Sequence, residues 1–436
     1  MEILNIDKFS KKKSKMTETD QKDQYDYNYI CKIGGGGCGT VHLYWKTDIQ
    51  KFRVIKFIRV SSEQTDRILH YFNRESKISI ESNHPAILKT FDCHLRIHDG
   101  IEIPVNQIEI NQYEEYSPYI EMEYLPAASL EDKYCSDEIP FISVHTLVIA
   151  YGVASALQYL HSKKIIHRDV KPSNILLGRT TKNYSEPFLS DFGFSRKVKN
   201  NDIVESKPGT PLFAAPELYH SENESYDHRI DIYAYGMTLY YLSQGNFPLS
   251  NEGKYHSLIQ KIVDGIPSKE AEKLYKEKNV KEMKLISACL NSDPNKRPLH
   301  SDILHEIVEL SKDLSEEDQA LFQEYKEKVD KNERRQENST EVTVENIAAA
   351  ADELIPEGIL VQGMIQYYGY GVEKDICQCL CSFNFLYEQH LEDDSYTPFY
   401  YIARRLGRQI VETEKIDPFD ASLASLTSFI DLLKNS

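Results

Sequence analysis

The sequence predicts an α+β fold with a small strand-rich lobe, a large helical lobe and an α-helical tail. Short segments rich in β-branched and aromatic residues recur before residue 125, and apolar residues at helical spacing begin near residue 143. A highly charged stretch after residue 311 separates this part from a tail of different composition. The length of 436 residues fits two or three domains rather than one ordinary core.

Charge and hydropathy narrow the partners that we expect. The formal net charge is −17, whereas nucleic-acid-binding proteins usually carry a basic face. Residues 1–26 are mostly polar and are expected to form a disordered arm, with no apolar run long enough for a signal peptide or a membrane span. We therefore expect no nucleic acid, no membrane and a cytoplasmic location. The lysine cluster at 11–15 leaves a nuclear location open, and the eight cysteines are expected to be reduced thiols.

A glycine-rich turn lies between the first two expected strands, 25–33 and 40–44. Glycine lets the backbone approach phosphate groups closely, because no side chain stands in the way. Residues 34–37 and 39 are glycines. The turn alone is also compatible with a polyglycine hairpin or a dinucleotide site, although a dinucleotide site would be followed by a helix.

The next expected strand, 52–58, carries Lys56. A lysine on a buried strand needs an acidic partner, and Glu75 in the expected helix 62–81 is the candidate. An extended hairpin is expected between 91 and 119, with Asp-Gly at its turn. A core helix is expected over 143–162, and the polar residues 178–187 are expected to form a surface loop.

Two motifs in the large lobe indicate phosphoryl transfer. Residues 167–174 read His-Arg-Asp-Val-Lys-Pro-Ser-Asn, and Asp-Phe-Gly begins 22 residues after Asp169. Phosphoryl transfer needs a group that orients the attacking hydroxyl and ligands that hold magnesium. Asp169 is the candidate to accept the hydroxyl proton, Lys171 to neutralise charge, and Asn174 and Asp191 to hold the metal. A lone His-Arg-Asp could be a solvated loop, but the two motifs in this order favour catalysis.

These motifs, together with Ala-Pro-Glu at 215–217 and Gly-Thr at 209–210, resemble the eukaryotic protein kinase family of the serine/threonine type. The resemblance covers residues 27–311. It implies a bilobal protein kinase fold, ATP and Mg²⁺ as cofactors, and protein substrates.

The resemblance also implies residue roles in nucleotide binding. Lys56 would pair with Glu75, Met122 would close the back of the pocket, and Glu123 and Leu125 would offer main-chain hydrogen bonds to adenine. The other residues implied to bind ATP are Ile33, Gly34, Gly36, Gly39, Val41, Val54 and Leu176. Val54 stands where the family usually has alanine. Ser129 and Ser173 stand where arginine-directed kinases place glutamates, so a preference for basic substrates is not supported.

Further family contacts are implied in the large lobe. Arg297 would form a buried ion pair with Glu217, and the hydroxyl of Thr210 would lie beside Asp169 and Lys171. Residues 231–236 would begin a buried central helix.

Ser206 lies at the family's usual position for an activating phosphate, where Arg168 and Arg196 would converge on it. The alternative is that Ser206 is never modified and that Arg168 pairs with a nearby carboxylate such as Glu205 or Asp202.

Residues 312–341 are expected to be a charged helical linker, and residues 342–436 a helical tail. The glycines and tyrosines of 363–375 are similar to the Sel-one-like repeat, whose glycines permit close helix approach and a tight turn. One repeat cannot bury its apolar face alone, so we expect the tail to pack on neighbouring helices or on the kinase lobe. The cysteines at 377, 379 and 381 are interpreted as small buried residues rather than metal ligands.

Two functions remain to be compared. The first is an active ATP-dependent serine/threonine kinase whose tail binds protein partners. The second is a pseudokinase scaffold that binds partners through the tail. The presence of Lys56, Glu75, Asp169, Asn174 and Asp191 favours the first.

Overall fold

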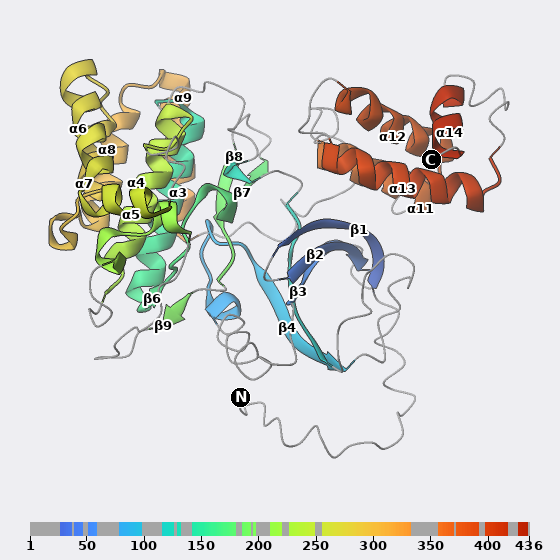
Figure 1. The fold of residues 1–436 in the computed structure, drawn as a ribbon, viewed down its shortest axis with the longest axis horizontal. Helices are drawn as coiled ribbons and strands as arrows, with labels where there is room; N and C mark the ends of the chain where they lie inside the picture. The colour runs from blue at the N-terminus through green and yellow to red at the C-terminus, as the bar shows by residue number, and fades with distance from the viewer. Residues whose placement is uncertain are drawn as a thin grey trace, which may run out of the picture.

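The computed structural model places a strand-rich lobe, a helical lobe and a group of tail helices in succession along the chain (Figure 1). It describes residues 27–36, 39–46, 51–58, 78–97, 116–125, 129–131, 142–179, 185–192, 195–197, 210–219, 226–248, 255–332, 356–369, 372–391, 397–416 and 426–434.

The small lobe is one antiparallel five-stranded sheet in the order β1-β2-β3-β5-β4. Its strands are β1 (Tyr27–Gly36), β2 (Gly39–Lys46), β3 (Lys51–Ile58), β4 (Thr90–Ile97) and β5 (Tyr116–Glu123). The strands expected from the sequence are present. In the expected helix 62–81, the described residues 78–81 are helical, and the tip of the expected hairpin lies outside the described residues.

Residues on the strands of this sheet alternate between two apolar clusters, as the two-residue period of a strand requires. Leu43, Phe52 and Val54 belong to one cluster, whereas Tyr44 and Ile55 belong to another. On the central strand β3, Phe52, Val54 and Lys56 therefore share a face. That face carries the site described below.

The large lobe is built around helix α3 (Val144–Ser162), which is buried along most of its length. Ser143 caps its first turn, because its side chain accepts a hydrogen bond from the backbone N–H of Thr146. The other elements of this lobe are the strands β6 (Ile165–Ile166), β7 (Ile175–Arg179), β8 (Ser185–Leu189) and β9 (Arg196–Lys197), and the helices α4 (Arg229–Gln244), α5 (Tyr255–Val263), α6 (Ile266–Lys278), α7 (Met283–Cys289), α8 (His300–Ser311) and α9 (Glu316–Asp330). Helix α4 is the buried central helix expected from the sequence.

Helix α9 packs on α3, although the sequence suggested a charged linker at this point. Phe322, Tyr325 and Val329 follow a helical spacing and are buried in the core that also contains α3. Tyr151 on α3 donates a hydrogen bond to Asp330, with 2.6 Å between the oxygen atoms. The charged residues of α9 lie mainly on its other faces, which is why composition alone suggested a linker.

The surface loop expected over 178–187 is wrong at both ends, because residues 178–179 belong to strand β7 and pair with β8. Residues 185–187 belong to strand β8 and are buried. Lys328 of α9 donates to both carboxylate oxygens of Glu186, at 2.7 and 2.8 Å. A side chain at Gly152 would come within 2.5 Å of Pro187, so the small residue on α3 makes room for this strand.

The described tail contains four helices: α11 (Pro356–Tyr368), α12 (Ile376–His390), α13 (Thr397–Thr413) and α14 (Thr427–Lys434). A Cβ atom at Gly363 on α11 would lie 2.7 Å from the ring of Phe383 on α12, so glycine permits the close helix approach that the sequence suggested. The tail core joins the small-lobe face of Leu43, Phe52 and Val54 in one buried cluster. The expectation that the tail packs on neighbouring helices and a lobe is confirmed.

The tail cysteines differ in their environments. Cys379 is buried in the tail core, whereas Cys381 is exposed on α12. Among the described residues, no group of three metal-ligating side chains comes together. None of the described helices combines the length and apolar character needed to span a membrane.

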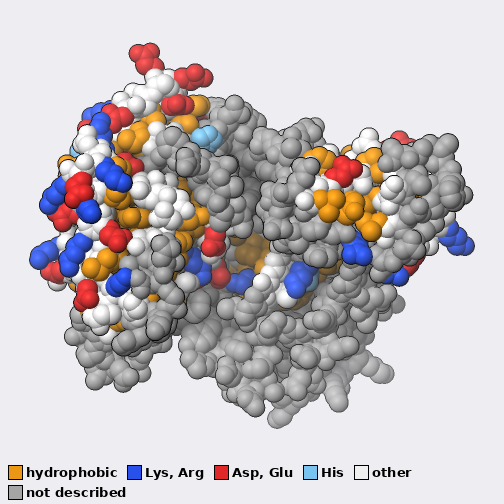
Figure 2. Space-filling model, turned by 45° about the horizontal axis from the view of Figure 1, so that its top comes forward, with side chains coloured by type: hydrophobic (Ala, Val, Ile, Leu, Met, Phe, Trp, Pro, Cys, Tyr) orange, Lys and Arg blue, Asp and Glu red, His pale blue; other side chains and the backbone are white. Residues whose placement is uncertain are grey.

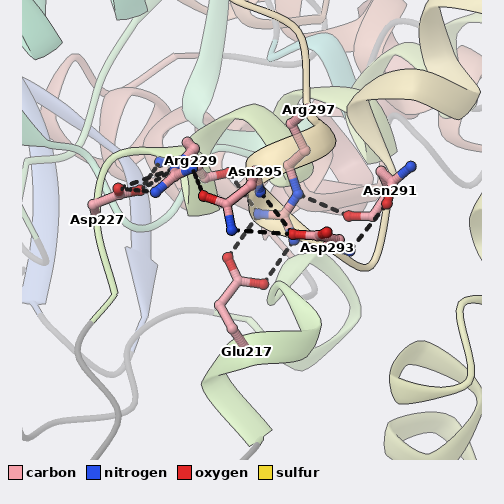
Figure 3. A network of polar contacts seen from close by, with 7 residues as sticks. All are labelled: Glu217, Asp227, Arg229, Asn291, Asp293, Asn295 and Arg297. Carbon is pink, nitrogen blue, oxygen red and sulfur yellow. Dashed lines mark hydrogen bonds and ion pairs between the residues drawn. The ribbon is translucent and has the colours of Figure 1, made fainter.

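An ion pair at the base of the large lobe joins segments far apart in sequence (Figure 3). Arg297 donates two hydrogen bonds to the carboxylate of Glu217, both at 2.7 Å, and its side chain is fully buried. Arg297 also donates to the backbone oxygens of Arg229 and Asn291. The predicted pair of Glu217 with Arg297 is confirmed.

We predict that Arg297→Ala lowers the free energy of unfolding by about 3–5 kcal/mol, because the partner charge stays buried without its counter-ion. Urea unfolding would measure this. The control is Lys276→Ala, which removes an exposed pair with Glu272 and should change stability by less than about 1 kcal/mol. Equal effects of the two changes would contradict the prediction.

The buried side chain of His42 should make the stability of the protein depend on pH. Its ring is 2 % exposed between Tyr29 and Phe57, and neither ring nitrogen has a hydrogen-bond partner among the described residues. Burial, with a smaller effect of Lys32, lowers its pKa from 6.5 to about 4. The unfolded chain therefore binds a proton at a pH where the folded chain does not.

The free energy of unfolding should fall as the pH drops below about 6.5. His42 alone should lower it by about 2 kcal/mol between pH 7 and pH 5. In His42→Phe this part of the pH dependence should disappear. Urea unfolding of both proteins at the two pH values would measure it. An identical loss of stability in both proteins would rule out His42 as its source.

Candidate active site

A cleft of about 520 Å³ lies between the two lobes, a volume typical of small-ligand pockets. Figure 2 shows a hollow with apolar side chains between the helical lobe and the tail. The described residues that line the cleft include Ile33, Gly34, Val41, Val54, Lys56, Met122, Glu123, Leu125, Asn174, Leu176 and Asp191, all of which the sequence suggested for nucleotide or metal binding.

Gly34 and Gly35, on strand β1 before the glycine turn, line the cleft. Gly36 and Gly39 face each other across the β1–β2 hairpin. A Cβ atom at position 39 would lie 1.9 Å from the backbone oxygen of Phe57, so only glycine fits there. The start of β2 can therefore pack directly against the end of β3.

Strand β5 ends in the segment that the sequence placed against adenine. Glu123 donates its backbone N–H to the backbone oxygen of Lys89 at 3.0 Å, and its carboxylate accepts from the backbone N–H of Lys89 at 2.6 Å. This pairing fixes the chain at the point where it passes from the small lobe to the large lobe.

Lys56 reaches across the cleft to the second motif. Its Nζ atom lies 2.8 Å from Oδ1 of Asp191, and its side chain is 12 % exposed. The two residues that the sequence gave to phosphate and metal binding are therefore in direct contact. Glu75, the expected partner of Lys56, lies outside the described residues, so that pairing remains a prediction.

Asp169 lies at the centre of a polar cluster on the large lobe and is buried. Asn174 donates its side-chain amide to Oδ2 of Asp169 at 2.9 Å and to its backbone oxygen at 2.8 Å. Lys171 places its Nζ atom 2.9 Å from Oδ2 of the same carboxylate. The first motif thus brings all three of its candidate side chains together.

Thr210 completes this cluster from a distant part of the chain. Its hydroxyl accepts from Lys171 at 2.9 Å and lies 3.2 Å from Oδ1 of Asp169, to which it donates. Its backbone N–H also donates to that oxygen. The expectation that Thr210 lies beside Asp169 and Lys171 is confirmed.

Asp231 on helix α4 binds the backbone of the first motif. Its carboxylate accepts the backbone N–H groups of His167 at 2.7 Å and Arg168 at 2.8 Å. Arg168 has φ = 75° and Asp191 has φ = 60°, a conformation that costs energy for residues other than glycine. These hydrogen bonds offset the cost at Arg168.

A row of histidines extends from Asp231 toward helix α8. His161 lies 2.8 Å from the carboxylate of Asp231 and 2.8 Å from Nε2 of His300, and the ring of His228 lies nearby. Burial alone would raise the pKa of Asp231, but its hydrogen bond with His161 and its other contacts hold that pKa below its ordinary value. Asp231 is therefore a charged acceptor for the motif above it.

The two motifs are also joined to each other. Burial lowers the pKa of His167, so its ring is neutral, and Nε2 of that ring lies 3.1 Å from the backbone oxygen of Ser190. Its ring also packs against Phe192. This arrangement fixes the position of Asp191 relative to Asp169.

The oxygen atoms at this end of the cleft fit a magnesium ion. Asp169 receives the amide hydrogens of Asn174, which leaves the side-chain oxygen of Asn174 as its remaining ligand group. Together with the carboxylate of Asp191, it offers the oxygen ligands that Mg²⁺ prefers.

Sequence reasoning missed several residues that line the cleft. Leu88, Thr90, Ile120, Ser129 and Glu131 contribute to its walls. Leu88 and Thr90 lie just after the helix of residues 78–81, where no sequence pattern marks a ligand site. Ile120 could have been found, because it lies two residues before Met122 on the same strand face.

The activating phosphate on Ser206 and the convergence of Arg168 and Arg196 on it remain predictions. Ser206 lies outside the described residues, and of Arg196 only the backbone is described, in β9. The described contact of the Arg168 guanidinium is with the ring of Tyr226, at 5.8 Å from its centroid.

Comparison with known proteins identifies relatives of this chain. The chain is 29% identical to the ovarian-specific serine/threonine-protein kinase Lok of Drosophila melanogaster over 288 residues, which cover 63% of this chain and 54% of Lok. It is 31% identical to the serine/threonine-protein kinase TIO of Arabidopsis thaliana, over 62% of this chain and 18% of TIO. It is 27% identical to the serine/threonine-protein kinase PknB of Mycobacterium tuberculosis H37Rv, over 58% of this chain and 37% of PknB.

The chain thus spans about half or less of the length of these relatives. The family model for the protein kinase domain matches residues 27–308, which include both lobes, the cleft and both motifs. This match covers well over half of the sequence, and the chain belongs to the protein kinase domain family.

Proposed function

We propose that this protein is an ATP-dependent protein kinase that transfers the γ-phosphoryl group of ATP to serine or threonine hydroxyls of protein substrates. The observation that supports this most is the cluster around Asp169. A buried carboxylate there contacts Lys171, Asn174 and Thr210 at the edge of a cleft that also contains the pair of Lys56 with Asp191.

Asp169 is the proposed catalytic base. Its Oδ1 and Oδ2 atoms face Thr210 and Lys171, so a substrate hydroxyl at this place could donate its proton to the carboxylate. Lys171 would neutralise negative charge on the moving phosphoryl group, because its ammonium group lies beside that carboxylate. Thr210 would hold both side chains in position.

Lys56 is the proposed phosphate ligand. Its present partner is a carboxylate, and an ammonium group that binds one anion can equally bind a phosphate oxygen. Asn174 and Asp191 would hold Mg²⁺, which supplies charge neutralisation between the phosphates when bound. Val54, Val41 and Leu176 would cover the adenine ring with apolar surface.

The choice of serine or threonine rests on the chemistry around Asp169 and on the relatives. Lys171 two residues after Asp169 and Thr210 against both are typical of serine/threonine kinases, and the relatives named above are described as serine/threonine-protein kinases. Protein partners of the tail and an activating phosphate on Ser206 belong to the same proposal.

We predict that Asp169→Asn lowers phosphate transfer from radiolabelled ATP to a generic protein substrate by about 10²- to 10⁴-fold, because an amide cannot accept the proton. ATP binding should persist. Asp313→Asn is the control. Asp313 lies between α8 and α9, and its exposed carboxylate pairs with Lys281. Equal incorporation by wild type and Asp169→Asn would contradict the proposal, and binding of ATP without transfer by either would favour the pseudokinase scaffold.

A second prediction concerns Thr210. Thr210→Val keeps the shape of the side chain but removes the hydroxyl that joins Lys171 to Asp169, and should lower kcat about tenfold with little change in KM for ATP. Thr210→Ser keeps the hydroxyl and should retain most of the activity. Steady-state kinetics of the three proteins would decide, and equal kcat values for the valine and serine variants would count against this role.

A further inference from the structure

The tail and the nucleotide cleft share one face of the small-lobe sheet. On strand β3, Lys56 and Val54 line the cleft, while Val54 and Phe52 belong to the buried cluster that contains the tail core. Residues two apart on a strand are about 7 Å apart. Val54 of the tail cluster therefore lies two residues, or about 7 Å, from the lysine that contacts Asp191.

The segment just after strand β5 also contributes to both the cleft and the tail cluster. Tyr124 lines the cleft and also belongs to the tail cluster, with its ring 6.0 Å from that of Phe52. Ile33, Val41 and Met122 line the cleft and pack against this cluster. No described tail residue lines the cleft itself. The tail thus supports the wall of the cleft without filling it.

Helix α11 is the tail element closest to the sheet, and it approaches strand β1. Figure 1 shows the tail helices next to the curved strands β1 and β2. One side of α11 faces the other tail helices, because Gly363 contacts Phe383 of α12 and Tyr367 donates to Glu414 after α13.

The opposite side of α11 is buried as well. Val361 and Ile365 lie two residues before and after Gly363, which places each about 160° around the helix from it. Their exposures are 1 % and 2 %. Both belong to the buried cluster that joins the tail helices to Leu43 and Phe52 of the small lobe, and α11 is the tail helix that approaches the sheet.

We propose that the docked tail regulates nucleotide binding: α11, through Val361 and Ile365, holds the sheet wall of the cleft in its binding conformation. The inference rests on the proposed function, because it takes ATP as the ligand. Docking of the tail and binding of ATP are then coupled in both directions, since a coupling free energy between two sites is reciprocal. A partner protein that captures this side of α11 would weaken ATP binding.

The first test compares two substitutions at neighbouring positions in the full chain. Val361→Asp puts a charge into the tail–sheet contact, whereas Gln362→Asp puts the same charge about 100° around the helix at a partly exposed position. We expect Val361→Asp to raise the Kd for ATP with Mg²⁺ about 5- to 50-fold in isothermal titration, and Gln362→Asp to leave it unchanged. An unchanged Kd in Val361→Asp would overturn the inference.

The second test uses the wild-type chain, so that it does not depend on how well a variant folds. By reciprocity, saturating ATP with Mg²⁺ should slow hydrogen exchange of the α11 amides, while exchange in α8 stays the same. Bound ATP with no change at α11 would refute the coupling but leave the proposed function intact. A failure of the wild-type chain to bind ATP would overturn the proposed function and this inference with it.

Discussion

The carboxylate of Asp231 is the interaction on which the site depends most. It is 1 % exposed, and a charge buried in this way is tolerated only when hydrogen bonds satisfy it. The three donors come from the backbone of His167 and Arg168 and from the ring of His161. Because two of them are backbone groups of the catalytic segment, the same bonds that satisfy the charge fix that segment on α4. The rigid core of the large lobe thereby sets the position of Asp169.

A second connection ties the lobes together behind the cleft. The backbone of Leu189 on β8 exchanges hydrogen bonds with Ala86 and Leu88 of the small-lobe segment, at 2.9 and 3.0 Å. Ala86 and Ile87 belong to the large-lobe core although they precede β4. The segment between the helix of residues 78–81 and β4 therefore belongs to the large-lobe packing. Leu88, which lines the cleft, is thereby hydrogen-bonded to the large lobe.

Local chemistry explains which parts of the fold and site could be predicted from the sequence. Asp169, Lys171 and Asn174 lie close together in the sequence, so their spacing already predicts that their side chains meet. The position of Thr210 and the pair of Glu217 with Arg297 were available only through the family resemblance, because nothing local joins them. The packing of α9 was missed, since a helix needs only one apolar stripe to be buried and its remaining faces can be charged.

The same reasoning explains why the role of the tail could not be predicted. The sequence predicted a helical unit that cannot bury its apolar face alone, but it did not show which surface of the lobe that face would contact. In the structure, the tail helices share one buried cluster with Phe52 and Val54, which lie on one face of β3. Under the coupling proposed above, a residue that stabilises the tail also restrains the sheet wall of the cleft. Substitutions in the tail core therefore cannot be interpreted as effects on a separate module, because the two units share the side chains of Val54 and Tyr124.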